Sequence, residues 1–199
     1  RLLVFTTLGI AVLGIVLRRE AVSLLFGYGR FDDAAVEVTA GALGIFLLGL
    51  PAHSGIAILA RAFYAAQDTR TPMVGAVLAV LVNVAVSIAT VGELGIRGLA
   101  LGIAAGAWLE VAFLVVRLGG ALPGLSAARE AAGWLRSAAT ASVAGVAIWS
   151  ATVFLGWTGP ALASGKASVA LVAGVATAAF VGLYVGLATA ARQSEPATI

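Results

Sequence analysis

Long uncharged apolar runs separated by short polar segments dominate the pattern along the chain. A helix that spans a membrane needs about 20 mainly apolar residues. Six runs approach or reach that length, and they cover residues 2–17, 34–52, 71–91, 96–116, 136–155 and 166–191. The pattern therefore predicts an all-α, polytopic membrane protein with about six transmembrane helices.

Prolines and a threonine at the borders of these runs predict where helices bend and begin. Pro51 interrupts the second run and predicts a kink, with a helical continuation over residues 54–66. Thr71 is the predicted N-cap of the third helix, because a hydroxyl accepts backbone hydrogen bonds there. Pro72 then occupies the first helical position, where its missing N–H costs nothing.

Composition indicates that hydrocarbon surrounds most of the chain. The 199 residues are 61% hydrophobic and only 11% charged, and their mean hydropathy is +1.08. A soluble domain carries about 25% charged residues. A soluble helix bundle would also show polar stripes at helical spacing, whereas residues 137–165 and 167–191 contain no charge. We therefore favour a membrane protein over a soluble bundle.

The same composition excludes several classes of function. The net charge is +3, but the basic residues stand singly between apolar runs, which gives no support for nucleic-acid binding. The chain has no cysteine and a single histidine, and it contains no metal-protease, nucleophile-elbow, phosphate-loop or dinucleotide motif. The sequence therefore predicts no enzyme, no metal site and no organic cofactor.

Basic residues in the short loops predict the orientation of the helices. Six spans place both chain ends on one side of the membrane. Seven arginines lie on that side: Arg1, Arg61, Arg70, Arg117, Arg129, Arg136 and Arg192. Five basic residues lie on the other: Arg18, Arg19, Arg30, Arg97 and Lys166. The positive-inside rule then places both ends in the cytoplasm.

A few polar side chains within or beside the apolar runs are candidates for chemistry. Glu110 falls inside the fourth predicted helix, where a charge is costly. It either serves a cation, a proton or an arginine, or it reaches the interface or is simply protonated. Asn83 and Ser87 stand one turn apart on the third helix and can offer oxygens to a cation or to a neighbouring helix. His53 follows the proline break, where it either senses pH or is simply a polar residue.

The densest polar cluster joins the second and third helices on the predicted cytoplasmic side. Residues 61–72 read RAFYAAQDTRTP and include Arg61, Asp68 and Arg70. A helix end, an Asp/Thr turn and a proline-started helix follow one another here. The pattern predicts either a gate or hinge surface or a well-capped loop.

Small residues recur every four positions on two predicted helices. They are Gly98, Gly102 and Gly106 on the fourth helix, and Gly174, Ala178, Gly182 and Gly186 on the sixth. Small side chains let a second helix backbone approach closely in a membrane. The spacing therefore predicts one packed face on each helix.

Several short motifs recur along the first two thirds of the chain: LLFGYGRFD at 24–32, GLPA at 49–52, RAFYA at 61–65, DTRTP at 68–72, and GELG at 92–95 followed by GLAL at 98–101. Together these motifs resemble those of the MurJ/MviN family of bacterial lipid II flippases. The motifs and their spacing cover about residues 20–118, and beyond that only the pattern of spans agrees.

The resemblance implies two lobes and fourteen transmembrane helices in the whole protein. Residues 1–118 would form family helices nine to twelve, and residues 119–199 a cytoplasmic linker and helices thirteen and fourteen. The chain would then be a C-terminal fragment. Its partner would be the missing N-terminal lobe, which in the family carries the arginines credited with gripping the pyrophosphate.

The resemblance also implies a transport function in the bacterial cytoplasmic membrane. Such proteins move the undecaprenyl-pyrophosphate-linked precursor lipid II to the outer leaflet by alternating access. Arg61 and Arg70 would attract its anionic head group or anionic membrane lipids. Some relatives bind sodium through an Asn, an Asp and a Thr. Asn83 matches the first, but Ser87 and Ile103 replace the others, which weakens a site for a hard cation. A coupling cation, sodium or proton, therefore stays open.

Two alternatives remain beside lipid II transport. One is an exporter of the same superfamily that carries drugs or polyprenyl-linked polysaccharides. The other is a transporter lobe that has become a membrane scaffold.

Overall fold

The computed structural model describes residues 2–121, 143–151 and 166–193. These residues are helical apart from short turns, and no strand occurs among them. The helices are α1 (Leu2–Val16), α2 (Arg18–Phe26), α3 (Asp33–Ala65), α4 (Arg70–Leu94), α5 (Ile96–Ala121) and α7 (Lys166–Gln193), with a further helical segment over residues 143–151. The all-α prediction is confirmed.

Four helices are long and apolar enough to cross a membrane. These segments are Asp33–Ala65, Arg70–Leu94, Ile96–Gly119 and Val169–Leu187, and α1 adds a shorter apolar stretch over Thr6–Val16. Only residues 143–151 of the fifth predicted span are described, and the predicted linker lies outside the described residues after residue 121. The multi-pass membrane architecture is thus confirmed, whereas the count of six spans and the boundary at residue 118 stay predictions.

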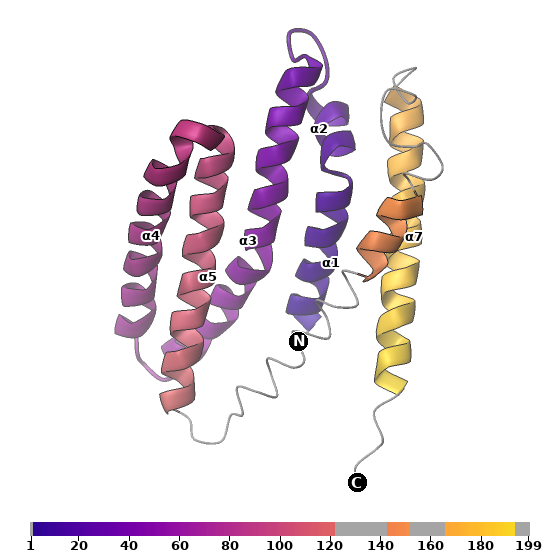
Figure 1. Ribbon diagram of the computed structural model, residues 1–199. Coiled ribbons are helices and arrows are strands. Elements are labelled where there is room, and N and C mark those ends of the chain that lie inside the picture. The colour runs from indigo at the N-terminus through magenta and orange to yellow at the C-terminus, as the bar shows by residue number, and fades with distance from the viewer. Residues whose placement is uncertain (1, 122–142, 152–165, 194–199) are drawn as a thin grey trace.

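The helices stand side by side in one row (Figure 1). α4 packs along α5, α5 packs along α3, and α1 and α2 pack against α3 from the other side. α7 follows beyond α1 (Figure 1). The start of α1 and the end of α7 lie at the same end of the helices (Figure 1), as an even number of membrane crossings would require.

Small apolar clusters hold neighbouring helices together. α3 and α5 meet at Ala52, Ala107 and Val111, all buried. Another cluster joins α1, the segment 143–151 and α7 around Leu17 and Phe180. Alanines at these contacts let the backbones approach closely, which is how helices associate when lipid removes the usual hydrophobic drive.

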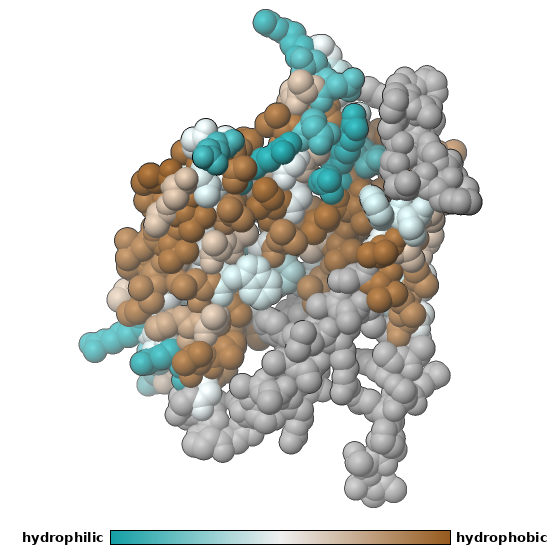
Figure 2. Space-filling model, in the orientation of Figure 1, coloured by the Kyte–Doolittle hydropathy of each residue, from teal (hydrophilic) through white to brown (hydrophobic). Residues whose placement is uncertain are grey.

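The outer face of α4 is apolar and uncovered. Val77, Leu81, Val84 and Ile88 are all exposed, Ile88 by 72%. Figure 2 shows the brown, hydrophobic surface that α4 contributes on one edge of the molecule. Water would disfavour so much contiguous apolar surface, and a bilayer would accept it, so this face agrees with the membrane assignment.

Pro51 lies inside α3. The helix continues past the proline to Ala65, as the sequence predicts for residues 54–66. Pro51 has no N–H to donate, so the ladder of backbone bonds is interrupted there. Side chains serve nearby carbonyls: the Ser54 hydroxyl donates to Leu50 O at 3.2 Å and to Pro51 O at 3.0 Å, and Trp108 Nε1 donates to Leu48 O at 3.0 Å. The Ser54 and Trp108 side chains thus add hydrogen bonds to the helix beside the proline.

The glycines of α5 form the predicted packed face, whereas the predicted face on α7 has no described neighbour. A Cβ added to Gly102 would lie 2.7 Å from Asn83 Oδ1, and one added to Gly106 would lie 2.6 Å from Ala79 O. A Cβ at Gly174, Gly182 or Gly186 would meet no described atom within 4 Å. The packed face on α5 is thus confirmed, and the packed face on α7 stays a prediction.

Candidate functional site

The turn between α3 and α4 is organised by Asp68. Its Oδ1 accepts hydrogen bonds from the backbone N–H groups of Arg70 and Thr71, both at 3.0 Å. Its Oδ2 accepts a 2.6 Å bond from the Thr71 hydroxyl. The prediction that Thr71 caps α4 is therefore wrong, because the helix begins at Arg70 and Thr71 donates to the capping carboxylate instead. Gln67 completes the turn with a left-handed φ of 59°.

Hydrogen bonding also sets the ionisation of Asp68. The bond from the Thr71 hydroxyl, followed by that from the Thr71 backbone N–H, holds the pKa of Asp68 below its usual value of 3.8. Weaker contributions in the same direction come from the backbone N–H of Arg70 and the charge of Arg117. The carboxylate is thus the stable form near neutral pH.

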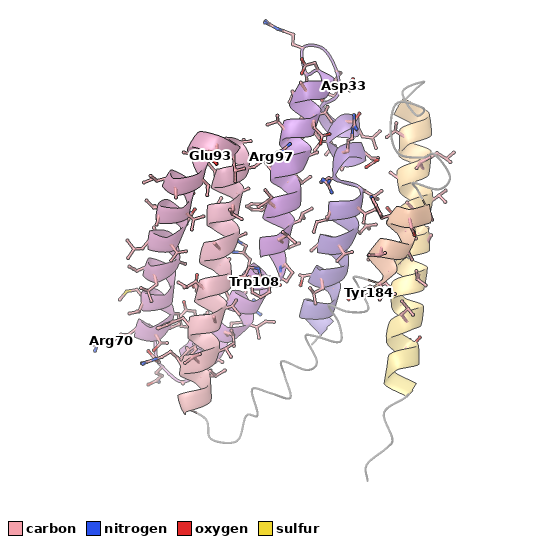
Figure 3. The ribbon with its side chains drawn as sticks, in the orientation of Figure 1. Asp33, Arg70, Glu93, Arg97, Trp108 and Tyr184 are labelled. Carbon is pink, nitrogen blue, oxygen red and sulfur yellow. The ribbon has the colours of Figure 1, made fainter. Side chains whose placement is uncertain are left out.

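Arg61 and Arg70 lie at the same end of the molecule as Asp68, and both are exposed. Figure 3 shows Arg70 at the tip of α4, pointing away from the helices, while Glu93 and Arg97 lie at the opposite end. The structure therefore gathers three of the predicted gate residues around one turn. Their role as a gate stays a prediction.

Asn83 and Ser87 form a polar contact within the α4–α5 interface. The Ser87 hydroxyl donates to Asn83 Oδ1 at 3.1 Å. Both side chains face Gly102 of α5, where an added Cβ would collide with the Ser87 hydroxyl. Ile103, which replaces the expected threonine, instead lines a groove between α3 and α5. The arrangement favours helix packing over cation binding, and no group of three or more His, Cys, Asp or Glu gathers in the described ranges.

Glu110 and His53 lie on different helices. Glu110 is a partly buried residue of α5, and His53 is an exposed residue of α3. A Cβ added to Gly75 of α4 would lie 3.4 Å from Glu110 Cγ, so the Glu110 side chain lies against α4.

An apolar groove of about 320 Å³ runs between α3 and α5. Phe46 and Ile103 are among its lining residues. His53 follows Phe46 by seven residues, and Glu110 follows Ile103 by seven, which places each pair on one helix face. The Phe46 and His53 rings are neighbours, with centroids 6.4 Å apart.

Arg18 and Arg97 converge on α3 at the other end of the molecule, which the sequence did not predict. Arg97 of α5 donates to Glu37 O at 3.3 Å and lies across Gly41 of α3. The side chain of Arg18 lies over Gly44, one turn further along α3. The bare glycine surface of α3 makes room for both side chains. Arg18 and Arg97 are 79 positions apart in sequence, and no sequence pattern indicates their convergence.

Comparison with known proteins gives consistent matches. The family model described as "Lipid II flippase MurJ" matches residues 1–164. A "Probable lipid II flippase MurJ" from Rhizobium tropici is 39% identical over 114 residues, which are 57% of this chain and 21% of that protein. The "Lipid II flippase MurJ" of Burkholderia cenocepacia is 36% identical over 142 residues, 68% of this chain and 26% of the relative. The chain thus spans about a quarter or less of the length of these relatives.

A solved structure shares the fold. "Lipid II flippase MurJ, inward closed conformation" superposes with a TM-score of 0.76 and 17% sequence identity, covering 96% of this chain and 37% of that one. An identity this low establishes a shared fold only. The family model, however, covers most of the 199 residues. Taken with the apolar helices and the motifs at the turns, this match shows that the chain belongs to the MurJ family.

Proposed function

We propose that this chain supplies helices of the C-terminal lobe to a lipid II flippase of the bacterial cytoplasmic membrane. The observation that carries the proposal is the match of the family model over residues 1–164. The relatives named as lipid II flippases come from bacteria, which supports the cytoplasmic membrane as the location.

The proposed mechanism is alternating access, in which two lobes rock around a substrate site at their interface. The substrate is lipid II, with its undecaprenyl tail in the bilayer and its pyrophosphate in a watery cavity. The uncovered apolar surface of α4 suits the lipid side of such a protein. Membrane lipids and the remaining helices of the same protein are the partners.

In this mechanism the turn around Asp68 helps to close the cytoplasmic side. Arg61 and Arg70 stand exposed beside it and offer positive charge to the anionic head group. Asp68 fixes the turn through its three hydrogen bonds, so the two arginines project from an ordered support.

Depletion of the full-length protein in its own bacterium tests the proposal. Loss of a lipid II flippase should cause lipid II to accumulate in the inner leaflet and the cells to lyse. A plasmid copy of the wild-type gene should restore growth, and a copy with both arginines changed, R61Q and R70Q, should restore it less well. The reference is R30Q, which removes one arginine charge from the turn between α2 and α3.

Unchanged levels of lipid II and normal envelope synthesis after depletion would contradict the proposal and favour the scaffold alternative. Accumulation of a different polyprenyl-linked sugar would favour a sibling exporter.

A further inference from the structure

Two arginines from different helices lie against one glycine face of α3. Gly41 and Gly44 are one turn apart, so a side chain at either position would point to the same side of the helix. A Cβ added to Gly41 would lie 2.7 Å from Arg97 Cζ, and one added to Gly44 would lie 3.5 Å from Arg18 Nε. Because Cβ positions one turn apart are about 5–6 Å from each other, Arg18 Nε and Arg97 Cζ are at most about 12 Å apart.

Both guanidinium groups have hydrogen-bond donors to spare. A guanidinium carries five N–H donors. Arg97 Nη2 donates to Glu37 O at 3.3 Å, and Arg18 Nη1 donates to Ile15 O at 2.8 Å. Among the described residues, no carboxylate lies within 4 Å of either group. Two positive charges that converge without such a partner favour an anionic ligand with several acceptor oxygens, such as a phosphate.

The acidic residues nearby are directed elsewhere. The Glu37 carboxylate lies 3.9 Å from Arg19 Nε. Glu20 follows Arg18 by two positions on α2, and residues two apart on a helix do not face each other. The other acidic residues of this part of the structure lie at helix ends: Asp32, Asp33 and Glu93. The charge over the glycine face of α3 is therefore positive.

This face lies at the depth of the lipid head groups. α3 has 33 residues and is therefore about 48 Å long, whereas the hydrocarbon core is about 30 Å thick. If α3 is centred in the bilayer, about 9 Å of it projects beyond the core at each end. Gly41 lies about 12 Å along the helix from its start at Asp33. Arginine side chains at this boundary reach the head groups of the lipids.

Apolar surface continues from the arginines toward the middle of the helices. Leu48 lies one turn beyond Gly44 on the same side of α3, and its side chain is 55% exposed. Trp108 follows Arg97 by three turns on the same side of α5, and its Nε1 donates to Leu48 O at 3.0 Å. Figure 3 shows Arg97 near the end of the helices and Trp108 nearer their middle. Positive charge at the boundary with an apolar surface beneath it matches the shape and polarity of a phospholipid.

We propose that Arg18 and Arg97 bind the phosphate of an anionic phospholipid, with an acyl chain lying along Leu48 and Trp108. The orientation predicted from the basic residues places this lipid in the outer leaflet. The phosphate joins α2 and α5 across the glycine face of α3, so its binding stabilises the packing of the three helices. The site does not depend on which substrate the full-length protein transports.

The first test measures binding of fluorescent phosphatidylglycerol to the full-length protein in detergent. R18Q and R97Q should each weaken binding about fivefold, the factor expected for one basic residue near anionic lipid. R30Q is the matched control, because it removes an exposed arginine from the turn between α2 and α3 and should leave binding unchanged. Fluorescent phosphatidylcholine, which has no net charge, should bind wild type more weakly than phosphatidylglycerol does.

The variant G41A tests the geometry while keeping every charge. Its Cβ would collide with Arg97 Nε, and the flexible arginine side chain would move away from α3. G41A should therefore weaken phosphatidylglycerol binding about as much as R97Q does. Its melting temperature without added lipid should not fall, because alanine is the better helix residue. Phosphatidylglycerol should raise the melting temperature of wild type and leave that of the double variant R18Q/R97Q unchanged.

Three results would overturn the inference. The first is equal binding of phosphatidylglycerol by wild type and R18Q/R97Q, and the second is wild-type binding by G41A. The third is displacement of phosphatidylglycerol by inorganic phosphate at equal concentration, since a free anion gains nothing from the apolar surface of Leu48 and Trp108. Weak competition by inorganic phosphate would support a lipid as the ligand.

Discussion

At the scale of single residues, Asp68 links hydrogen bonding, ionisation and the start of a helix. The first turn of any helix exposes backbone N–H groups that lack partners within the helix. Asp68 accepts two of them and the Thr71 hydroxyl as well. Its negative charge also lies at the positive end of the α4 dipole. One side chain thus sets both where α4 begins and how the turn is held.

Replacing Asp68 with alanine should destabilise the protein in a pH-dependent way. The pKa of Asp68 is lower in the folded protein than its usual 3.8. The stabilisation is therefore complete above that value and disappears as the pH falls through the folded pKa. D68A should melt at a lower temperature than wild type at pH 7, and the difference should shrink in acid. Thermal unfolding of the full-length protein in detergent measures this.

The control for this prediction is E93A, which removes an exposed carboxylate from the last turn of the same helix. It should leave the melting temperature close to that of wild type. A D68A deficit that stays constant down to the lowest pH would contradict the assignment of the stabilisation to the ionised carboxylate.

Residues of the right kind were predictable from sequence, but their partners were not. Asp68, His53 and Glu110 each stood out as polar groups in or beside apolar runs. The cap was assigned to Thr71, because a threonine before a proline fits that position equally well and only geometry separates the two. Arg18 and Arg97 converge on α3 although they are 79 positions apart, and no periodicity relates residues on different helices.

At the scale of elements, the α4–α5 contact depends on glycine. A Cβ at Gly102 would collide with the Ser87 hydroxyl and lie 2.7 Å from both Asn83 O and Asn83 Oδ1. Backbone atoms of α4 cannot rotate away as a flexible side chain can. The two helices would have to separate, which would also disturb the hydrogen bond between Ser87 and Asn83.

The variant G102A should therefore cost about 1–3 kcal/mol of stability through overpacking. G92A is the matched control, because an added Cβ at Gly92 of α4 meets no described atom within 4 Å. There alanine should be neutral or stabilise by about 0.5–1 kcal/mol, since glycine is a poor helix residue. Melting temperatures of the two variants in the same detergent test the difference. Equal losses for both would contradict a close α4–α5 approach at Gly102.

The long elements were predictable because apolar length is a strong signal in a membrane. The predicted spans at 71–91 and 96–116 lie within α4 and α5. α2 was missed because its first three residues, Arg18, Arg19 and Glu20, interrupt the apolar run and suggested a loop. The small-residue pattern on α7 could not indicate whether any helix covers it, since that depends on neighbours rather than on spacing.

At the scale of the whole molecule, charged residues concentrate near the two ends of the helices rather than along their length. Arg70 lies at one end, and Asp33, Glu93 and Arg97 lie at the other (Figure 3). Figure 2 shows hydrophilic residues at these ends, separated by a broad apolar band. The band marks the part of the helices that suits the bilayer, and the asymmetry of basic residues predicts which end faces the cytoplasm.

Single cysteines test this orientation directly, because the 199 residues contain none. A66C lies in the turn between α3 and α4, and D33C lies in the first turn of α3 at the other end. A membrane-impermeant maleimide added to intact cells should label D33C at once. It should label A66C only after the membrane is permeabilised. The reverse pattern would place the turn around Asp68 outside the cell.

The connection between α4 and α5 has a mechanical consequence. Gly95 alone separates Leu94 from Ile96, and its φ of 56° folds the chain back on itself. So short a link leaves no slack for one helix to slide past the other. The two helices must therefore swing as a single stiff lever, carried by the ordered turn around Asp68.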